Sequence, residues 1–203
     1  MPTIPRGLSI MATLIPALSP RLTSLTHWTV HFLTGIRHQR TGQALVHVRS
    51  PSPSLSPSVL SQTHGAIIAF EVSDALGSFV NCEAIEYGAG KSGICLRAGC
   101  MCNPGGTSYA TGMGFVMDAV RSGDRKEDLE ARFGVRSRGV VVSHQDFIIC
   151  VGLTLTAFSQ QRASFGIASN FADAWAFIEY MRSLAVENAM QRLLDDWGKA
   201  PAH

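Results

Sequence analysis

The chain has 203 residues, enough for one domain with a substantial hydrophobic core or for two small domains. Its composition, 46% hydrophobic and 16% charged, is typical of a soluble globular protein, and no apolar run approaches the ~20 residues of a membrane span. A net charge of +2 gives no indication of a surface that binds nucleic acid.

The N-terminal third of the chain lacks acidic residues. The first is Glu71, and five arginines precede it. An acid-free segment with Arg and Ser can be a mitochondrial transit peptide, and residues 8–18 can pass for a weak signal-peptide core. We favour the simpler interpretation, an ordinary helix and loop of a domain. The five cysteines are an odd number in a chain of this length, which favours reduced thiols and a cytoplasmic location, with the mitochondrion as the alternative.

The first half of the chain contains one predicted helix and two predicted strands. Ser19 is expected to cap the helix, with Pro20 at its first position, and the helix should end before residue 41. Residues 43–48 alternate as a strand does, and residues 66–72 form a buried strand. The Ser/Pro-rich stretch between them, residues 51–57, is expected to be an exposed loop.

After a turn at residues 74–77, residues 78–87 suit either a short helix or a strand. A short strand at 94–96 follows. Helices are then predicted at residues 108–121 and 124–133.

The C-terminal part begins with a predicted strand at residues 162–167, and Asn170 then caps a strong helix with Asp173 in its first turn. The buried stripe of that helix is formed by Ala174, Ile178, Met181 and Ala185. A last helix carries Leu193, Leu194 and Trp197. Strands and helices intermix without a regular βαβ repeat, so we predict an α+β fold, a small antiparallel or mixed sheet covered by helices.

The most informative stretch is residues 93–106, in which an apolar strand is expected to end at Arg97 and a loop then shows two thiols, Cys100 and Cys102. Glycines and a proline keep this loop out of regular structure. A cation at a strand end beside a loop thiol suits an anionic substrate held near a nucleophile. A zinc site would need two more ligands, with Cys82, Cys95 and His64 as the candidates, and we predict no metal.

Three segments of the chain, residues 66–70, 97–105 and 162–170, together resemble the class V aminotransferases and cysteine desulfurases, and among these the molybdenum cofactor sulfurase branch. The C-terminal small domain of that family has Arg-Thr-Gly at a strand end, followed by Cys-Phe-Cys-Asn-Pro-Gly. This chain has Arg-Ala-Gly followed by Cys-Met-Cys-Asn-Pro-Gly. The family then has an Arg-x-Ser-Phe-Gly strand and an Asn-capped helix. The resemblance covers residues 7–141 and 162–186.

The resemblance implies that residues 1–203 have the fold of the C-terminal small domain of fold-type I pyridoxal-phosphate enzymes. Cys102 then matches the persulfide-forming cysteine, Arg97 matches the arginine that binds the substrate carboxylate, and Cys100 is an accessory thiol without an assigned role. The complete family enzyme is a homodimer that moves sulfur from L-cysteine to its cysteine and on to an acceptor such as the molybdenum cofactor. This chemistry needs a thiolate and a fork-shaped cation.

One requirement of the family is missing from the chain. Pyridoxal phosphate forms a Schiff base with a lysine, which in the family follows a histidine in the large domain. The only lysines here are Lys91, Lys126 and Lys199, and none follows a histidine. We therefore predict that the chain binds no cofactor by itself and is inactive alone. The alternative is a non-catalytic remnant or partner-binding module of the same fold; neither reading involves nucleic acid or a membrane.

Residues 142–161 have no counterpart in the family pattern. Removing these 20 residues joins residues 138–141 directly to Arg162 and restores a continuous family-like strand. The segment can be encoded with a donor-like sequence at Val142 and an acceptor-like CAG at Gln161, as in a translated intron. A genuine insertion explains the same sequence, and both explanations stay open on the sequence alone.

Overall fold

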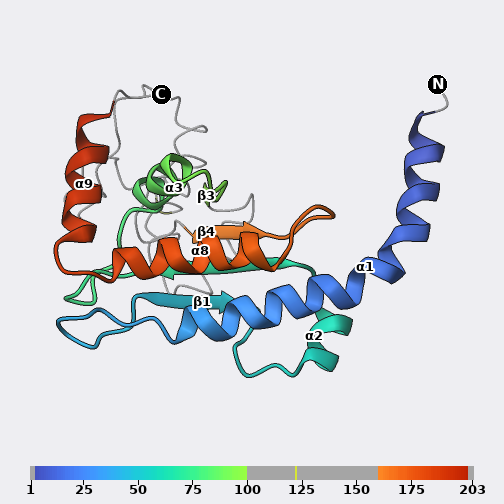
Figure 1. The fold of residues 1–203 in the computed structure, drawn as a ribbon, viewed down its shortest axis with the longest axis horizontal. Coiled ribbons are helices and arrows are strands. Elements are labelled where there is room, and N and C mark those ends of the chain that lie inside the picture. The colour runs from blue at the N-terminus through green and yellow to red at the C-terminus, as the bar shows by residue number, and fades with distance from the viewer. Residues whose placement is uncertain (1–2, 100–121, 123–159, 201–203) are drawn as a thin grey trace.

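The computed structural model describes residues 3–99, 122 and 160–200 (Figure 1). The helices and strands of these residues are α1 (Thr3–Thr34), β1 (Val46–Ser50), α2 (Pro57–Thr63), β2 (Ile67–Val72), α3 (Cys82–Lys91), β3 (Arg97–Gly99), β4 (Gln160–Ser164), α8 (Phe171–Leu184) and α9 (Ala189–Lys199). The helices predicted at 108–121 and 124–133 lie outside the described residues. No helix in the described ranges is long and apolar enough to cross a bilayer.

The four strands form one antiparallel sheet in the order β1-β2-β4-β3. The central pair, β2 and β4, comes from distant parts of the sequence, with Phe70 opposite Gln161 and Ala69 opposite Arg162. β3 forms one edge of the sheet and pairs only with β4 among the described strands. Helices and an antiparallel sheet segregated into layers confirm the predicted α+β class.

One face of the sheet carries the hydrophobic core. Phe70 is fully buried on this face, and its ring centroid lies 5.6 Å from that of Phe177 of α8. α1 and α8 run across this side of the sheet (Figure 1), and α3 adds Ile85 and Ala89 to the same core. Because neighbouring residues of a strand point to opposite faces, the residues that flank Phe70 belong to the second face.

The first helix begins earlier than the sequence predicts. α1 starts at Thr3 and contains both Pro16 and Pro20, so the predicted cap at Ser19 is wrong. A proline inside a helix removes one backbone hydrogen bond and bends the axis, and the N-terminal part of α1 turns away from the body here (Figure 1). The predicted apolar face is confirmed farther along, where Leu25 and Leu33 are fully buried.

Three further elements differ from the prediction or resolve it. A helix, α2, begins at Pro57, the last residue of the predicted loop, because proline suits the first helical turn. The ambiguous segment 78–87 contributes to α3, whose N-cap Asn81 accepts a hydrogen bond from the Glu83 N–H. The strand predicted at residues 94–96 lies three residues later, at Arg97–Gly99, where β4 supplies the backbone partners.

The C-terminal helices follow the prediction closely. Asn170 caps α8 by accepting hydrogen bonds from the Ala172 and Asp173 N–H groups, and the Asp173 carboxylate accepts the Asn170 N–H, a complete capping box. All members of the predicted stripe are buried: Ala174, Ile178, Met181 and Ala185. α9 packs on α3, and the exposed ion pair of Lys91 with Asp196 joins the two helices.

Candidate functional site

Arg97 is the first residue of β3, not the last residue of a strand as the sequence predicts. It lies directly opposite Arg162 of β4 in the antiparallel register, so the two side chains leave the same face of the sheet about 5 Å apart at Cβ. Arg162 in turn pairs with Ala69, which neighbours Phe70. The arginine pair therefore lies on the second face, opposite the hydrophobic core.

The two arginines differ in exposure. Arg97 is exposed, whereas Arg162 is half-buried and its Nε is a buried donor without a hydrogen-bond partner. Like charges directly opposite each other on a sheet repel, and an unpaired buried donor adds a further cost. A bound carboxylate would offset both, because it accepts two parallel hydrogen bonds from a guanidinium group.

An acidic side chain lies near this pair at the edge of the sheet. Burial raises the pKa of Glu86 on α3, the nearby Glu83 also raises it, and the Ala98 N–H and the Arg97 charge partly oppose the rise. The carboxyl group thus lies at the backbone of β3, close enough to Arg97 to be affected by its charge. It ties α3 to the strand that carries Arg97.

A second charged pair occupies the same face of the sheet farther along. The Arg49 Nε donates to Glu71 Oε2 at 2.5 Å, and the Glu71 side chain is only 4% exposed. Burial raises the pKa of Glu71 in spite of the hydrogen bond and charge of Arg49. Burial and the Arg49 and Arg37 charges lower the pKa of His47, which lies opposite Glu71.

Sequence reasoning did not assign a role to Arg162. The sequence predicts that Arg162 lies in a strand at residues 162–167. It does not predict that this strand pairs with β3, because the two strands are separated by about a third of the chain. The useful signal was the arginine at the start of the Arg-x-Ser-Phe-Gly strand. Cys100 and Cys102, the predicted thiols, lie outside the described residues. Cys102 follows Arg97 by five residues, a span of at most about 18 Å of extended chain.

The described lysines do not fit the role of a Schiff-base lysine. Lys91 is exposed on α3, and its hydrogen bonds to Asp196 and Tyr87 raise its pKa, whereas the role requires a lysine that loses its proton easily. Lys199 is exposed at the C-terminal end of α9. Neither described lysine is therefore suited to hold pyridoxal phosphate as a Schiff base.

The alternative zinc ligands are not gathered into a site. Cys82 is buried at the start of α3, Cys95 is exposed, and His64 follows the end of α2. No group of three His, Cys, Asp or Glu side chains suited to a metal ion occurs among the described residues.

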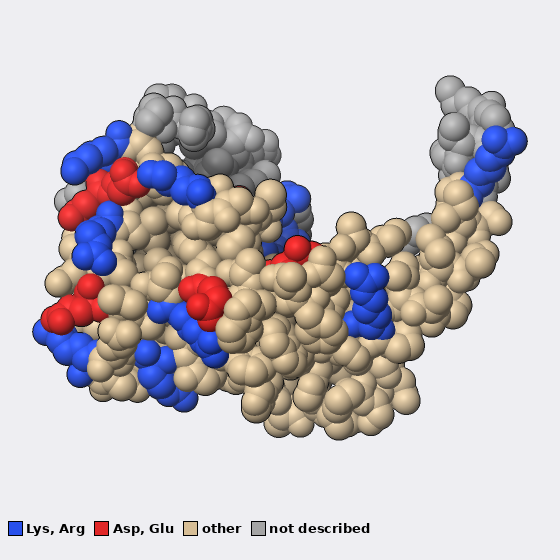
Figure 2. Space-filling view, in the orientation of Figure 1, with Lys and Arg blue, Asp and Glu red and all other residues tan. Residues whose placement is uncertain are grey.

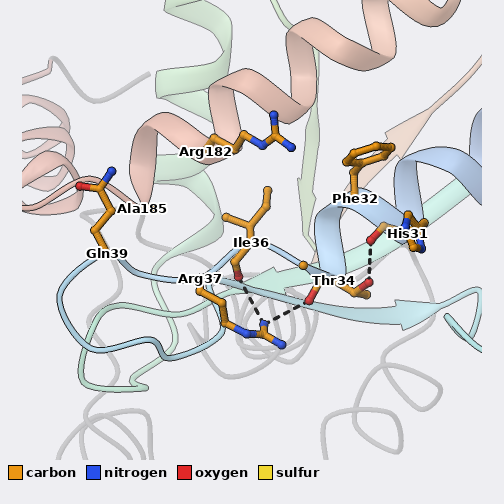
Figure 3. Close-up of a pocket in the computed structure, with 9 residues that line it drawn as sticks. His31, Phe32, Thr34, Ile36, Arg37, Gln39, Arg182 and Ala185 are labelled. Atoms are coloured by element: carbon orange, nitrogen blue, oxygen red, sulfur yellow. Dashed lines mark hydrogen bonds between the residues drawn. The ribbon is translucent and has the colours of Figure 1, made fainter.

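A cavity of about 690 Å³ lies away from the arginine pair. It opens between the C-terminal end of α1, the loop after it and α8 (Figure 3). Phe32 and Arg182 line it from the two helices, while the Arg37 guanidinium donates to the Thr34 and Ile36 carbonyl oxygens. These residues lie on the helix-covered side of the sheet, so the cavity does not contribute to the candidate site.

Known proteins similar to the chain share one name. Molybdenum cofactor sulfurase of Aspergillus niger is 36% identical over 78 residues, which cover 37% of this chain and 9% of the relative. The protein of the same name from Neosartorya fischeri is 28% identical over 131 residues, 62% of this chain and 13% of the relative. The protein of the same name from Arabidopsis thaliana is 29% identical over 181 residues, which cover 89% of this chain and 19% of the relative. Neither a protein-family model nor a solved structure matches the chain.

The similarity therefore concerns one region of a much longer protein. The chain spans between 9% and 19% of the length of these three relatives. It is similar to part of the molybdenum cofactor sulfurases, and this part includes most of the described fold.

Proposed function

We propose that this chain is the C-terminal small-domain part of a sulfurtransferase that uses pyridoxal phosphate and L-cysteine. The observation that carries the proposal is the pairing of Arg97 with Arg162 on one face of the sheet, immediately before the thiol loop. Two guanidinium groups side by side suit the carboxylate of an amino acid. The similarity to molybdenum cofactor sulfurases supports sulfur transfer as the reaction.

In this proposal each residue has a separate task. Arg97 and Arg162 bind and orient the L-cysteine carboxylate, which brings the substrate sulfur to the Cys102 thiolate. The carbon–sulfur bond of L-cysteine breaks, a sulfur–sulfur bond forms on Cys102, and the released amino acid is L-alanine. Pyridoxal phosphate supplies the electron sink for this step when a lysine outside this chain holds it. The terminal sulfur of the Cys102 persulfide is then transferred to an acceptor such as the molybdenum cofactor.

A non-catalytic, partner-binding role is the second candidate, and the surface of α1 favours it. The projecting part of α1 carries exposed Leu8, Ile10 and Ile15 and is almost free of charge (Figure 2). At its base is an apolar groove of about 340 Å³, lined in part by Leu18 and Phe165. Exposed apolar surfaces of this kind are typical of contacts with another domain.

Reconstitution in trans tests the proposal. The chain is produced alone and together with the part of the Arabidopsis thaliana relative that lies outside the matched 181 residues. With pyridoxal phosphate and L-cysteine we expect no alanine from the chain alone and measurable alanine from the pair. The Cys102→Ala variant should abolish alanine release.

The arginine substitutions locate the carboxylate site. Arg97→Lys and Arg162→Lys should raise the KM for L-cysteine, whereas Arg192→Lys, a change on exposed α9, should leave it unchanged. Alanine release by the chain alone contradicts the expected inactivity. A stable complex that releases no alanine supports the partner-binding role, provided that the relative's own segment restores release under the same conditions.

A further inference from the structure

Two glutamines at the start of β4 are buried, and each leaves one side-chain amide atom without a hydrogen-bond partner. Gln161 is 1% exposed and lies opposite Phe70 of β2 and Ala98 of β3, on the face of the sheet that holds the core. Its Oε1 accepts no hydrogen bond. An amide oxygen among apolar side chains has lost its water without gaining a donor, which destabilises the fold.

Gln160, on the other face of the strand, also has a buried amide atom without a hydrogen-bond partner. It is 4% exposed, pairs with Gly99 and leaves its Nε2 donor without an acceptor. Buried polar side chains in folded proteins are nearly always hydrogen-bonded, so two consecutive exceptions in a central strand need an explanation. An apolar side chain at either position would leave no polar atom unsatisfied.

The sequence holds such residues 20 positions earlier. Val140 and Val141 stand just before residues 142–161, the segment that Gln160 and Gln161 end. If this segment is absent, Val141 directly precedes Arg162 and takes the place of Gln161, and Val140 takes the place of Gln160. Valine is among the residues most favoured in buried strands, and it brings no polar atom to the core.

We infer that residues 142–161 are a translated intron, and that a form of this protein exists that lacks them, with Val140 and Val141 as the first residues of β4. The exchange leaves Arg162 at its register position opposite Arg97. It removes two buried orphan groups from the strand that positions Arg162. This inference concerns folding and transcript structure, so it stands independently of the proposed reaction.

Two deletions of equal length make a matched test. Removal of residues 142–161 joins Val141 to Arg162, and removal of residues 140–159 joins Gly139 to Gln160. The products have the same length and differ only in carrying Val-Val or Gln-Gln before Arg162. We expect the Val-Val product to melt about 4–10 °C higher, because the other retains two unsatisfied buried groups. An equal or lower midpoint overturns the inference.

A substitution in the full chain gives the same answer if both shortened proteins fail to fold. The double variant Gln160→Val, Gln161→Val should raise the melting midpoint of the 203-residue protein, and no rise overturns the inference. Sequencing of the transcripts across this junction tests the origin of the segment. We expect transcripts that lack the 20 codons with the reading frame intact; finding only transcripts that retain them overturns the intron.

Discussion

Arg97 of β3 and Arg162 of β4 are directly opposite each other in an antiparallel sheet, with both side chains on the face away from the core. A fold selected for stability alone avoids two like charges at this spacing, and Arg162 also leaves its buried Nε without a partner. Strain of this kind is expected where binding of a ligand offsets it. The pair should therefore cost stability in the ligand-free protein.

Removal of one charge from the pair should stabilise the ligand-free chain. We expect Arg97→Gln to raise the free energy of unfolding by about 0.2–1 kcal/mol at low ionic strength, and the gain should shrink as added salt screens the repulsion. Urea denaturation at two salt concentrations measures both effects. Arg192→Gln on exposed α9 is the control and should give no such gain. A loss of stability in Arg97→Gln would mean that the repulsion is not significant.

A second prediction concerns the contact between α3 and α9. A Cβ at Gly88 would lie 2.6 Å from Leu193 Cδ1 and 2.7 Å from Tyr180 Oη, which donates to the Ile85 carbonyl oxygen at 2.9 Å. Gly88→Ala must displace that buried hydroxyl, and we expect a loss of about 1–3 kcal/mol in the free energy of unfolding.

Gly90 of the same helix is the matched control, because a Cβ there meets nothing within 4 Å. Gly90→Ala should stabilise α3 by up to about 1 kcal/mol through helix propensity. Thermal or chemical denaturation compares the two variants. If both glycine substitutions change stability equally, α9 does not pack on α3 as closely as described.

Local signals made some elements predictable. The cap at Asn170 and the helical spacing of the apolar residues Ala174, Ile178 and Met181 define α8 without reference to the rest of the chain. The apolar run of β2 similarly indicates a buried strand. In both cases the information lies within about fifteen consecutive residues.

Other features depend on contacts that no local pattern reveals. β3 has three residues, and only its pairing with β4 decides that it begins at Arg97. The same pairing creates the arginine pair, so Arg162 is a site residue only in the folded chain. α1 continues through Pro16 and Pro20, although proline usually marks the start of a helix. The usual preference describes the average energetic cost of a proline inside a helix, and in this chain the turns on both sides of each proline still form.

The capping box of α8 supplies a third prediction. Asn170→Ala removes the acceptor for the Ala172 and Asp173 N–H groups, at 2.7 and 3.2 Å, and should cost about 1–2 kcal/mol of stability. Ser56 is the N-cap of α2 but makes no side-chain capping bond, so Ser56→Ala should have little effect. Denaturation curves of the two variants distinguish a true cap from a residue that only occupies the position. Equal curves would contradict the assigned role of Asn170.

The buried Glu71 gives the protein a predictable pH dependence. Burial raises its pKa in the folded state above the unfolded value of 4.5, so over that interval the folded state holds a proton that the unfolded state has lost. The Glu71 contribution to the free energy of unfolding must therefore fall as the pH rises from 4.5 through the raised pKa, and stay level above it. Glu86 contributes in the same direction. Glu71→Gln should remove the contribution of Glu71 to the dependence of the unfolding free energy on pH. Glu86→Gln should remove only the contribution of Glu86.

Substitution of Arg49 should enlarge the effect of Glu71. In Arg49→Met the Glu71 carboxylate loses its 2.5 Å partner, and we expect a loss of about 1.5–3 kcal/mol at pH 7, because a charged acceptor is left buried. The loss should shrink toward pH 4, where Glu71 is protonated and needs no cation. Denaturation at several pH values measures it. In the double variant Arg49→Met, Glu71→Gln the loss should be small at every pH; a large, pH-independent loss there would instead place the role of Arg49 in its packing over the Phe79 ring, 5.8 Å away.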